Sequence, residues 1–562
     1  MTNGIGIAQA LPLCETGSDG VARRSALETL GTHEAEATAL VGYRSAGYLL
    51  IIGNEDAALE CADRLRHCLH CTVLAPAPAD DSLSEAANNA RADSAHVTLV
   101  YGEPTELRGH LGRFSARLQT SRGEDLDLAP LTNADHPYFD LVLDLRTEPG
   151  LGMDLPPFGY YAPRGRETAL ERALDELPEM TGEFEKPKFF NYSPDICAHG
   201  DSGQKGCTRC IDACPTDAIR SGGDVIEVDP YLCQGGGTCA TACPTGAIIY
   251  AYPGPRDTLA AVRAMLQQYR AAGGARPVVL FHDTETGLER IHAAAADLPE
   301  NVLPCAVEEI GSLGMDTWLS ALAYGAGRVA LLDHDDVPPT VRGELEAQLE
   351  FAWSLLTGLG HDCGRLLLTT DPMAAEAGAT EGVAAAGFDT FNEKRGTLRL
   401  ALDHLRAVAP GGGQAVFGLP EGAPFGRVLV DTDACTLCMA CPQVCPTSAL
   451  TDGNEKPQLN FTEELCVQCG LCETACPEDA ITLEPRFVAD WEQRRRTQVL
   501  NEEEPFCCIS CGKPFATPST IERMLTRLEG HHMFETEQQK NRLRMCGDCR
   551  VKDIFSQEMQ DA

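Results

Sequence analysis

Two stretches of the chain alternate short apolar runs with helical segments. In the first stretch, apolar runs at residues 48–53, 71–76, 96–101 and 139–145 accompany a helical segment over residues 56–68. In the second, runs at 278–282, 301–307, 328–333 and 365–370 are separated by helical segments at 288–295, 318–324 and 339–359. Buried strands that alternate with helices are typical of a parallel sheet. The pattern therefore predicts two small parallel α/β domains.

The first of these stretches carries no motif for a nucleotide. Gly53 ends an apolar run without opening the Gly-x-Gly-x-x-Gly loop that would hold a pyrophosphate. A group of cysteines and histidines follows, and we interpret it as the end of a helix with chance thiols rather than as a metal site: Cys61, His67, Cys68, His70 and Cys71.

Closely spaced cysteines interrupt the α/β pattern near the end of the chain. The run Cys-x-x-Cys-x-x-Cys-x-x-x-Cys-Pro occurs twice, first at Cys435, Cys438, Cys441 and Cys445, and again at Cys466, Cys469, Cys472 and Cys476. It resembles the run of bacterial ferredoxins with two 4Fe-4S clusters, in which the fourth cysteine of each run binds the other cluster. Zinc knuckles or buried thiols are the alternative.

We expect the eight cysteines of this second module to hold two 4Fe-4S clusters. One cluster is expected on Cys435, Cys438, Cys441 and Cys476, and the other on Cys445, Cys466, Cys469 and Cys472. The proline after each fourth cysteine ends the local turn, because it lacks an N–H and fixes φ.

A first module of the same kind precedes it but departs from the pattern. Gln204 occupies the place of the first cysteine, although Cys197 lies upstream on a glycine-rich loop that can fold back toward the others. A 4Fe-4S cluster is therefore expected on Cys197, Cys207, Cys210 and Cys243. The segment 224–229 supplies the hairpin strand that the fold needs.

The second departure is Gly236, which stands where the middle cysteine of the second run would be. This leaves three thiolates, from Cys214, Cys233 and Cys239. Ferredoxins that lack this cysteine commonly carry a 3Fe-4S cluster, and the resemblance to them allows such a cluster here. A 4Fe-4S cluster with a water or non-cysteine ligand and a site without a cluster are the alternatives. His199 is a candidate ligand that we do not favour.

The end of the chain carries two Cys-x-x-Cys knuckles. Cys508, Cys511, Cys546 and Cys549 match the spacing of a closed tetrathiolate zinc site. We expect structural zinc there, with a further Fe-S cluster or plain thiols as the alternatives. Cys507 is not needed for the site.

These patterns predict an α/β and α+β multidomain protein, with two ferredoxin-like modules interleaved with two small parallel α/β domains and a zinc-ribbon-like tail. The expected division is a lead segment 1–45, an α/β domain 46–150, a linker 151–192, the first module 193–255, the second α/β domain 256–405, a linker 406–425, the second module 426–490 and the tail 491–562.

Composition narrows the class of protein further. The 562 residues carry a net charge of −38, which disfavours nucleic acid as a partner, because its phosphates would be repelled. The 26 cysteines fall mostly in metal-ligand spacings, which indicates a reducing compartment. No signal peptide and no apolar stretch long enough to span a membrane is evident in the sequence. We therefore expect a cytoplasmic protein.

Two wider resemblances suggest partners. Residues 298–332 are similar to the delta subunit of methyl-viologen-reducing hydrogenases, an adaptor that passes electrons between hydrogenase or formate dehydrogenase and heterodisulfide reductase. That family's cluster cysteines are absent here, where only Cys305 and Cys363 occur, so the resemblance implies a docking role. The order of the domains and the sequence segments 508–515 and 545–553 resemble those of bacterial 4Fe-4S proteins found with formate dehydrogenase accessory genes.

The sequence shows no constellation that would identify a catalytic site. We expect an electron carrier, or an electron-transfer subunit of an oxidoreductase, rather than an enzyme in its own right. Its partners would be redox proteins such as formate dehydrogenase or a hydrogenase. An assembly or maturation factor for a metal-dependent dehydrogenase is the alternative. An enzyme that uses an open iron at the Gly236 site is a third hypothesis.

Overall fold

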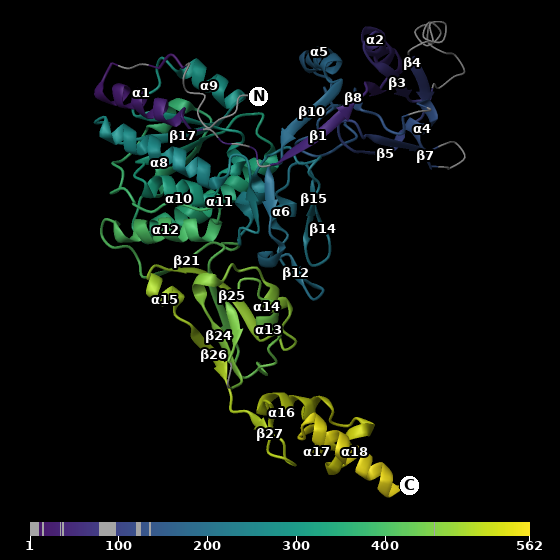
Figure 1. The fold of residues 1–562 in the computed structure, drawn as a ribbon, viewed down its shortest axis with the longest axis vertical. Coiled ribbons are helices and arrows are strands. Elements are labelled where there is room, and N and C mark those ends of the chain that lie inside the picture. Colours follow the sequence, from purple (N-terminus) through teal and green to yellow (C-terminus); the bar gives the residue numbers. More distant parts are fainter. Residues whose placement is uncertain are drawn as a thin grey trace.

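The computed structural model describes residues 11–561 except 14–15, 34, 36, 38, 78–96, 120–124, 134–135 and 454–455. Figure 1 shows the two α/β domains as separate bodies on either side of the first module, with the second module below them and the C-terminal helices at the far end. The described residues thus form a mixed α/β protein with several small sheets.

The N-terminal α/β domain is built on a parallel sheet in the order β4-β3-β2-β8-β9. Its strands are β2 (Tyr48–Ile52), β3 (His70–Ala75), β4 (Val97–Tyr101), β8 (Leu141–Asp144) and β9 (Tyr160–Tyr161). The helices are α2 (Glu55–Leu65), α4 (Leu128–Thr132) and α5 (Glu167–Glu176), and a side sheet contains β5 (Pro104–Arg108), β6 (Ser115–Gln119) and β7 (Asp125–Asp127). The predicted parallel sheet is confirmed.

The segment expected as a separate lead contributes to two neighbouring domains instead. Helix α1 (Ser18–Leu30) buries Ala22, Ala26 and Leu30 against the second α/β domain, more than 200 residues away in the chain, as Figure 1 shows beside α8. Strand β1 (Leu40–Ser45) pairs antiparallel with β10 (Gly182–Pro187), in the expected linker. An amphipathic helix can only bury its apolar face where a matching surface exists, and the sequence did not show where that surface would be.

The second α/β domain has a parallel sheet in the order β18-β17-β19-β20. Its strands are β17 (Val278–Asp283), β18 (Val302–Val307), β19 (Arg328–Leu332) and β20 (Leu366–Thr369). Its helices are α8 (Pro255–Ala271), α9 (Thr286–Ala294), α10 (Met315–Ala323), α11 (Pro339–Leu359) and α12 (Lys394–Ala407). Nearly every residue of its central strands is buried, as expected for a sheet covered on both faces.

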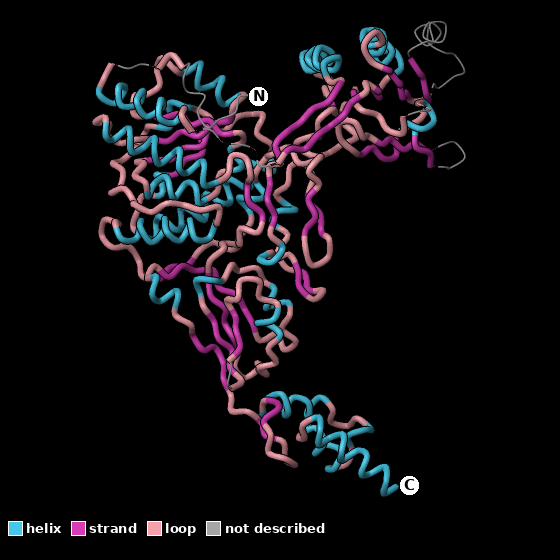
Figure 2. Tube along the Cα trace, viewed as in Figure 1, coloured by secondary structure: helices cyan, strands magenta, loops and turns pink. Residues whose placement is uncertain are grey.

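The first module is made of short strands and two single-turn helices, which Figure 2 shows as small magenta and cyan pieces between long loops. Strand β11 (Phe190–Tyr192) pairs with β16 (Ile248–Tyr250), and the predicted hairpin is β14 (Ile219–Ser221) with β15 (Ile226–Val228). Another hairpin joins β12 (Gly200–Asp201) and β13 (Gln204–Lys205). The two short helices are α6 (Arg209–Asp212) and α7 (Thr238–Ala242).

The second module has the same plan with longer strands. These are β21 (Val416–Gly418), β22 (Gly426–Val430), β23 (Leu450–Asp452), β24 (Gln458–Phe461) and β25 (Ile481–Val488), and its turns are α13 (Ala440–Gln443) and α14 (Leu471–Thr474). Strand β26 (Gln498–Glu502), after α15 (Trp491–Arg495), extends the sheet of β23 and β24.

The C-terminal domain pairs β27 (Phe506–Cys507) with β28 (Pro514–Ala516) and adds α16 (Pro518–Arg527), α17 (Glu537–Leu543) and α18 (Gly547–Asp561). It docks on the second module through Thr517 and Thr520, whose hydroxyls both donate to the Thr436 carbonyl at 2.9 Å. In the described part of the chain, no helix has the length and apolar character needed to cross a membrane.

Candidate iron-sulfur and metal centres

The second module gathers its eight cysteines into two groups. The outer group lines one cavity together with Leu459 and Ile481, and it consists of Cys435, Cys438, Cys441 and Cys476. The inner group surrounds Cys472: burial raises the pKa of that thiol, and nearby Cys466, Cys469 and Cys445 raise it further. The structure thus places the fourth cysteine of each run beside the first three of the other run, and the binding of clusters by these groups stays a prediction.

The ligand loops of this module are shaped by unusual backbone conformations. Leu437, Met439 and Gln468 have φ values of 52°, 61° and 53°, in the left-handed region that residues with a side chain rarely adopt. Donors reach sulfur in these loops: Gln468 Nε2 donates to Cys466 Sγ at 3.2 Å, and in the turn after Cys476 the Ala480 N–H donates to Cys476 Sγ at 3.3 Å. Donors of this kind stabilise thiolate charge and tune a bound cluster.

The first module brings Cys197 into place with a hairpin. The Cys207 N–H donates to the Ala198 carbonyl at 2.8 Å, and the residues between them form the β12–β13 hairpin, which contains Gln204. Cys197, Cys207, Cys210 and Cys243 line one cavity as a result. The structure therefore places Cys197 in the group from which the first cysteine of the regular run is missing, and its role as a ligand stays a prediction.

His199 lies beside this group with both of its ring nitrogens engaged. Nδ1 lies 2.9 Å from the Cys207 carbonyl oxygen, and Nε2 lies 2.7 Å from Ser221 Oγ. A histidine ligand needs one free ring nitrogen. We therefore interpret His199 as a brace of the loop that carries Cys207.

The remaining three cysteines of the first module, Cys214, Cys233 and Cys239, form a group of their own. Burial raises the pKa of Cys239, and Cys233 and Cys214 add to the effect. Gly236 is buried under the second α/β domain, where its carbonyl oxygen lies 2.4 Å from the position a Cβ would take at Gly311. The corner without a cysteine therefore faces protein rather than solvent.

The two modules touch at their inner groups. Ala198 of the first module packs against Val444 and Leu471 of the second, and Cys207 and Cys469 pack against this small apolar cluster. The cysteines are close enough for Cys207 to raise the pKa of Cys469, although burial is the larger cause. We call the group of Cys197, Cys207, Cys210 and Cys243 the inner group of the first module. The groups thus follow one another in this order: the three-cysteine group, the inner group of the first module, the inner group of the second module and the outer group.

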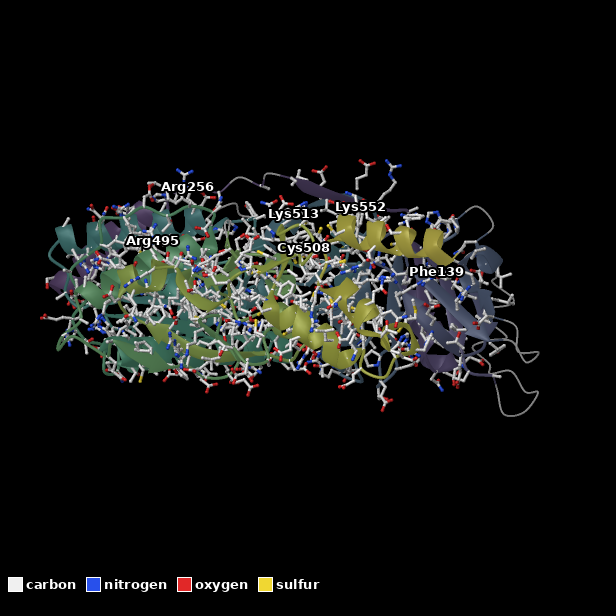
Figure 3. All side chains as sticks on the ribbon, turned by 90° about the horizontal axis from the view of Figure 1, so that it is seen from below. Phe139, Arg256, Arg495, Cys508, Lys513 and Lys552 are labelled. Carbon is white, nitrogen blue, oxygen red and sulfur yellow. The ribbon has the colours of Figure 1, made fainter. Side chains whose placement is uncertain are left out.

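The C-terminal cysteines are packed much more tightly. The sulfur atoms of Cys508, Cys511, Cys546 and Cys549 all lie within 4.8 Å of one another, with Cys511 and Cys546 at 3.7 Å. Burial opposes ionisation of Cys508, but N–H groups of Cys546, Cys511 and Ser510 outweigh it and lower its pKa to about 6. In Figure 3, Cys508 lies on the C-terminal domain, with Lys513 nearby.

Sulfur spacing separates two kinds of site. A tetrahedral ion with metal–sulfur bonds of about 2.3 Å needs sulfurs about 3.8 Å apart, which the C-terminal set provides. Among the described residues, no second group of metal-binding side chains is this compact. Two of the ferredoxin-type groups, Cys435 with its partners and Cys197 with its partners, instead line cavities, which suits a polynuclear cluster. The fold and these groups define an iron-sulfur protein.

Comparison with known proteins agrees with this class. Two family models, both described as a 4Fe-4S dicluster domain, match residues 179–247 and 434–481. A ferredoxin of Alicyclobacillus acidocaldarius subsp. acidocaldarius is 44% identical over 39 residues, which are 7% of this chain and 50% of that ferredoxin. A ferredoxin of Saccharopolyspora erythraea is 33% identical over 72 residues, which are 12% of this chain and 68% of that ferredoxin. The chain belongs to the ferredoxin family through these domains, although it spans only half the length of the first relative.

Three basic residues at the sites were missed by sequence reasoning. The Lys186 ammonium donates to the Tyr231 and Cys233 carbonyls, and burial lowers its pKa to about 8. Lys394 and Arg395 donate to the carbonyls of Cys243 and Cys466. All three lie outside the cysteine runs, so no spacing in the sequence connects them with the ligands.

Other candidates have structural roles. His334 Nε2 pairs with the Asp283 carboxylate, and His361 Nε2 lies 2.8 Å from the Leu405 carbonyl oxygen. Cys305 is fully buried in β18, whereas Cys363 is exposed. Cys61 and Cys71 are buried in the core of the first α/β domain, as expected for thiols that pack as apolar groups.

Proposed function

We propose that this protein relays single electrons through a series of iron-sulfur clusters between redox partners of the formate dehydrogenase or hydrogenase type. The 4Fe-4S dicluster domains and the ferredoxin relatives support an electron-transfer role. The observation that carries the relay is the contact between modules, where Ala198 and Leu471 pack together beside Cys207 and Cys469. A chain of clusters requires such a contact, because electrons tunnel only over short distances.

The cysteine groups supply the ligands in this proposal. The inner and outer groups of the second module hold 4Fe-4S clusters, as does the inner group of the first module. The group of Cys214, Cys233 and Cys239 holds a 3Fe-4S cluster, because the corner at Gly236 is closed by Gly311 and Val341 of the second α/β domain. A bound cluster supplies one-electron chemistry with little change of shape, and the chain positions and insulates it.

The closed corner also weighs against an enzyme that uses an open iron. A substrate at this corner would need the space that lies between Gly236 and Gly311, and those backbones are in contact. The C-terminal tetrathiolate site holds structural zinc in this proposal, since its four sulfurs have the spacing of a closed tetrahedral site.

The test is anaerobic quantification of iron, sulfide and zinc, with EPR as isolated and after reduction by dithionite. About fifteen irons, one zinc and the EPR signal of an oxidised three-iron cluster are expected. About sixteen irons would indicate a fourth 4Fe-4S cluster in place of the three-iron cluster, and the proposed relay would still stand. About eight irons without a signal from the first module would overturn the relay and favour a maturation factor.

Partner identity needs a second measurement. A holo formate dehydrogenase or hydrogenase should reduce the protein, or be reduced by it, within milliseconds in stopped-flow absorbance. Tight binding to an apo-dehydrogenase without electron exchange would instead identify a maturation factor.

A further inference from the structure

The first two residues of helix α12 reach both ferredoxin-like modules. Lys394 and Arg395 begin this helix of the second α/β domain, whose buried face contains Leu398, Ala401 and Leu405. The helix is therefore fixed in the core of that domain, and its N-terminal end projects to the place where the modules meet.

Lys394 binds the first module with all three of its ammonium hydrogens. Its Nζ lies 2.8, 2.6 and 2.9 Å from the carbonyl oxygens of Ala240, Thr241 and Cys243, at the end of helix α7. An ammonium group has three donors and no acceptor, so these contacts satisfy it completely. Cys243 belongs to the inner group of the first module.

Arg395 binds the second module in the same way. Its guanidinium donates at 3.2 Å to the carbonyls of Glu464 and Cys466, and at 2.9 Å to that of Pro424, while it stacks 4.6 Å from the Phe425 ring centroid. The residue is 6% exposed and carries a permanent charge. Cys466 belongs to the inner group of the second module.

Two neighbouring cations thus contact one ligand residue from each of the two inner groups, which themselves adjoin at Cys207 and Cys469. We propose that Lys394 and Arg395 form a cationic bridge that holds the inner sites at this junction and raises the reduction potentials of the clusters bound there. This inference rests on the proposed relay and names the residues that control its central step.

The physical reason is electrostatic. A cluster gains a negative charge on reduction, and a buried positive charge beside it favours the reduced state, because the low local dielectric leaves the attraction poorly screened. Lys186 repeats the arrangement at Cys233, where its ammonium also donates to the carbonyl of a ligand residue. A cation on a ligand carbonyl is therefore a recurring device of this chain.

The positive charges of Lys394 and Arg395 are offset to different extents by neighbouring charged groups. The carboxylates of Asp316 and Glu344 act on the Lys394 ammonium and partly neutralise it. Arg395 faces Glu393 and Glu464, but Arg399 adds a second positive charge from the next turn of the helix. We therefore expect the Arg395 half to have the larger effect on potential.

The test measures reduction potentials in the full-length protein by EPR-monitored redox titration. The signals of the two inner sites are assigned beforehand with Cys210→Ala and Cys472→Ala. Arg395→Gln should lower the reduced-to-oxidised ratio of the second module's inner site about tenfold at fixed potential, a shift of about 59 mV for one electron. Lys394→Gln should shift the first module's inner site in the same direction by less. Arg395→Lys, which keeps the charge, should recover most of the potential.

Arg399→Gln is the matched control, because Arg399 lies one turn along α12 and donates to the Glu464 carbonyl at 2.8 Å. Because Arg399 contacts the carbonyl of Glu464 rather than that of a ligand residue, Arg399→Gln should lower the potentials by less than Arg395→Gln does. Unchanged potentials in both bridge variants, with full iron content, would overturn the bridge and leave the relay standing. Wild-type protein without reducible inner sites would overturn the relay itself. If the Gln variants lose iron, Arg395→Lys, which keeps the positive charge, becomes the decisive variant. A fall of about tenfold in the reduced-to-oxidised ratio of the second module's inner site in Arg395→Lys would also overturn the proposal.

Discussion

The two ferredoxin-like modules differ in how much of each site they build from their own cysteine runs. The second module contains two complete runs, and its eight cysteines form two groups of four within residues 434–481. The first module lacks two cysteines of the pattern, at Gln204 and Gly236. It brings Cys197, which precedes an added hairpin, beside the remaining cysteines, and it covers the place of the other missing cysteine with a neighbouring domain.

The difference indicates that both sites of the first module depend on the rest of the chain, whereas in the second module Arg395 of α12 contacts the inner site and the outer site is built from the module's own cysteine runs. The ligand residues Cys233 and Cys243 accept hydrogen bonds from lysines outside the module, on β10 and α12. At the outer site of the second module, the C-terminal domain contributes neutral donors: the hydroxyls of Thr517 and Thr520 donate to the Thr436 carbonyl. Four variants test this comparison.

Removal of Cys469 should have the largest effect. We expect Cys469→Ala to lose the inner cluster of the second module, about four irons, and to stop electron exchange between modules. Iron content and the rate of reduction of the first module after mixing with a donor to the second module measure both effects. Cys363→Ala, which changes an exposed cysteine of the second α/β domain, is the control and should lose no iron.

The role of the hairpin is tested by moving the ligand. Cys197→Ala should lose about four irons from the first module. Adding Gln204→Cys should not restore them, because residue 204 is held in β13 by its pairing with Asp201. Recovery of the cluster in the double variant, measured by iron content and EPR, would show that the first module can adopt the regular run.

Gly236→Cys should raise the iron content of the protein by about one iron per chain. Gly235 and Gly237 have φ values of 83° and 76°, but Gly236 is not in that strained region, so it can accept a side chain. Its Cβ would lie 3.0 Å from Pro215 Cγ, which has to move slightly. We expect about one additional iron and loss of the three-iron EPR signal. Gly236→Ala makes the same contact without a thiol, so identical spectra from the two variants would contradict the prediction.

The smallest effect concerns the contact between modules. Leu471 is 1% exposed between Ala198 and Val444, and Leu471→Ala should cost about 2–4 kcal/mol in the free energy of unfolding. It should also weaken the EPR spin coupling between the two inner clusters, with iron content retained. Leu450→Ala removes a buried leucine from the core of the second module, outside the cysteine loops and away from the contact. It should destabilise similarly but leave the coupling unchanged.

Sequence patterns predicted the parts of this protein that depend on local spacing. The cysteine runs gave the membership of the groups, and apolar periodicity gave the two parallel sheets. The assignment of clusters and zinc to these groups stays a prediction. The contacts of Lys186, Lys394 and Arg395 could not be predicted, because their hydrogen bonds join residues from 29 to more than 150 positions apart. The same holds for α1, whose packing site lies more than 200 residues away.

The cover over Gly236 also sets an order of events during assembly. Gly311 and Val341 belong to a domain that is synthesised after the cysteines of the first module, and they close over the corner that Gly236 leaves open. A cofactor destined for Cys214, Cys233 and Cys239 would have to arrive before this closure, or the domain would have to release again to admit it. Repair of that site after oxidative damage would then require partial unfolding, whereas the outer site of the second module would stay accessible to a carrier protein.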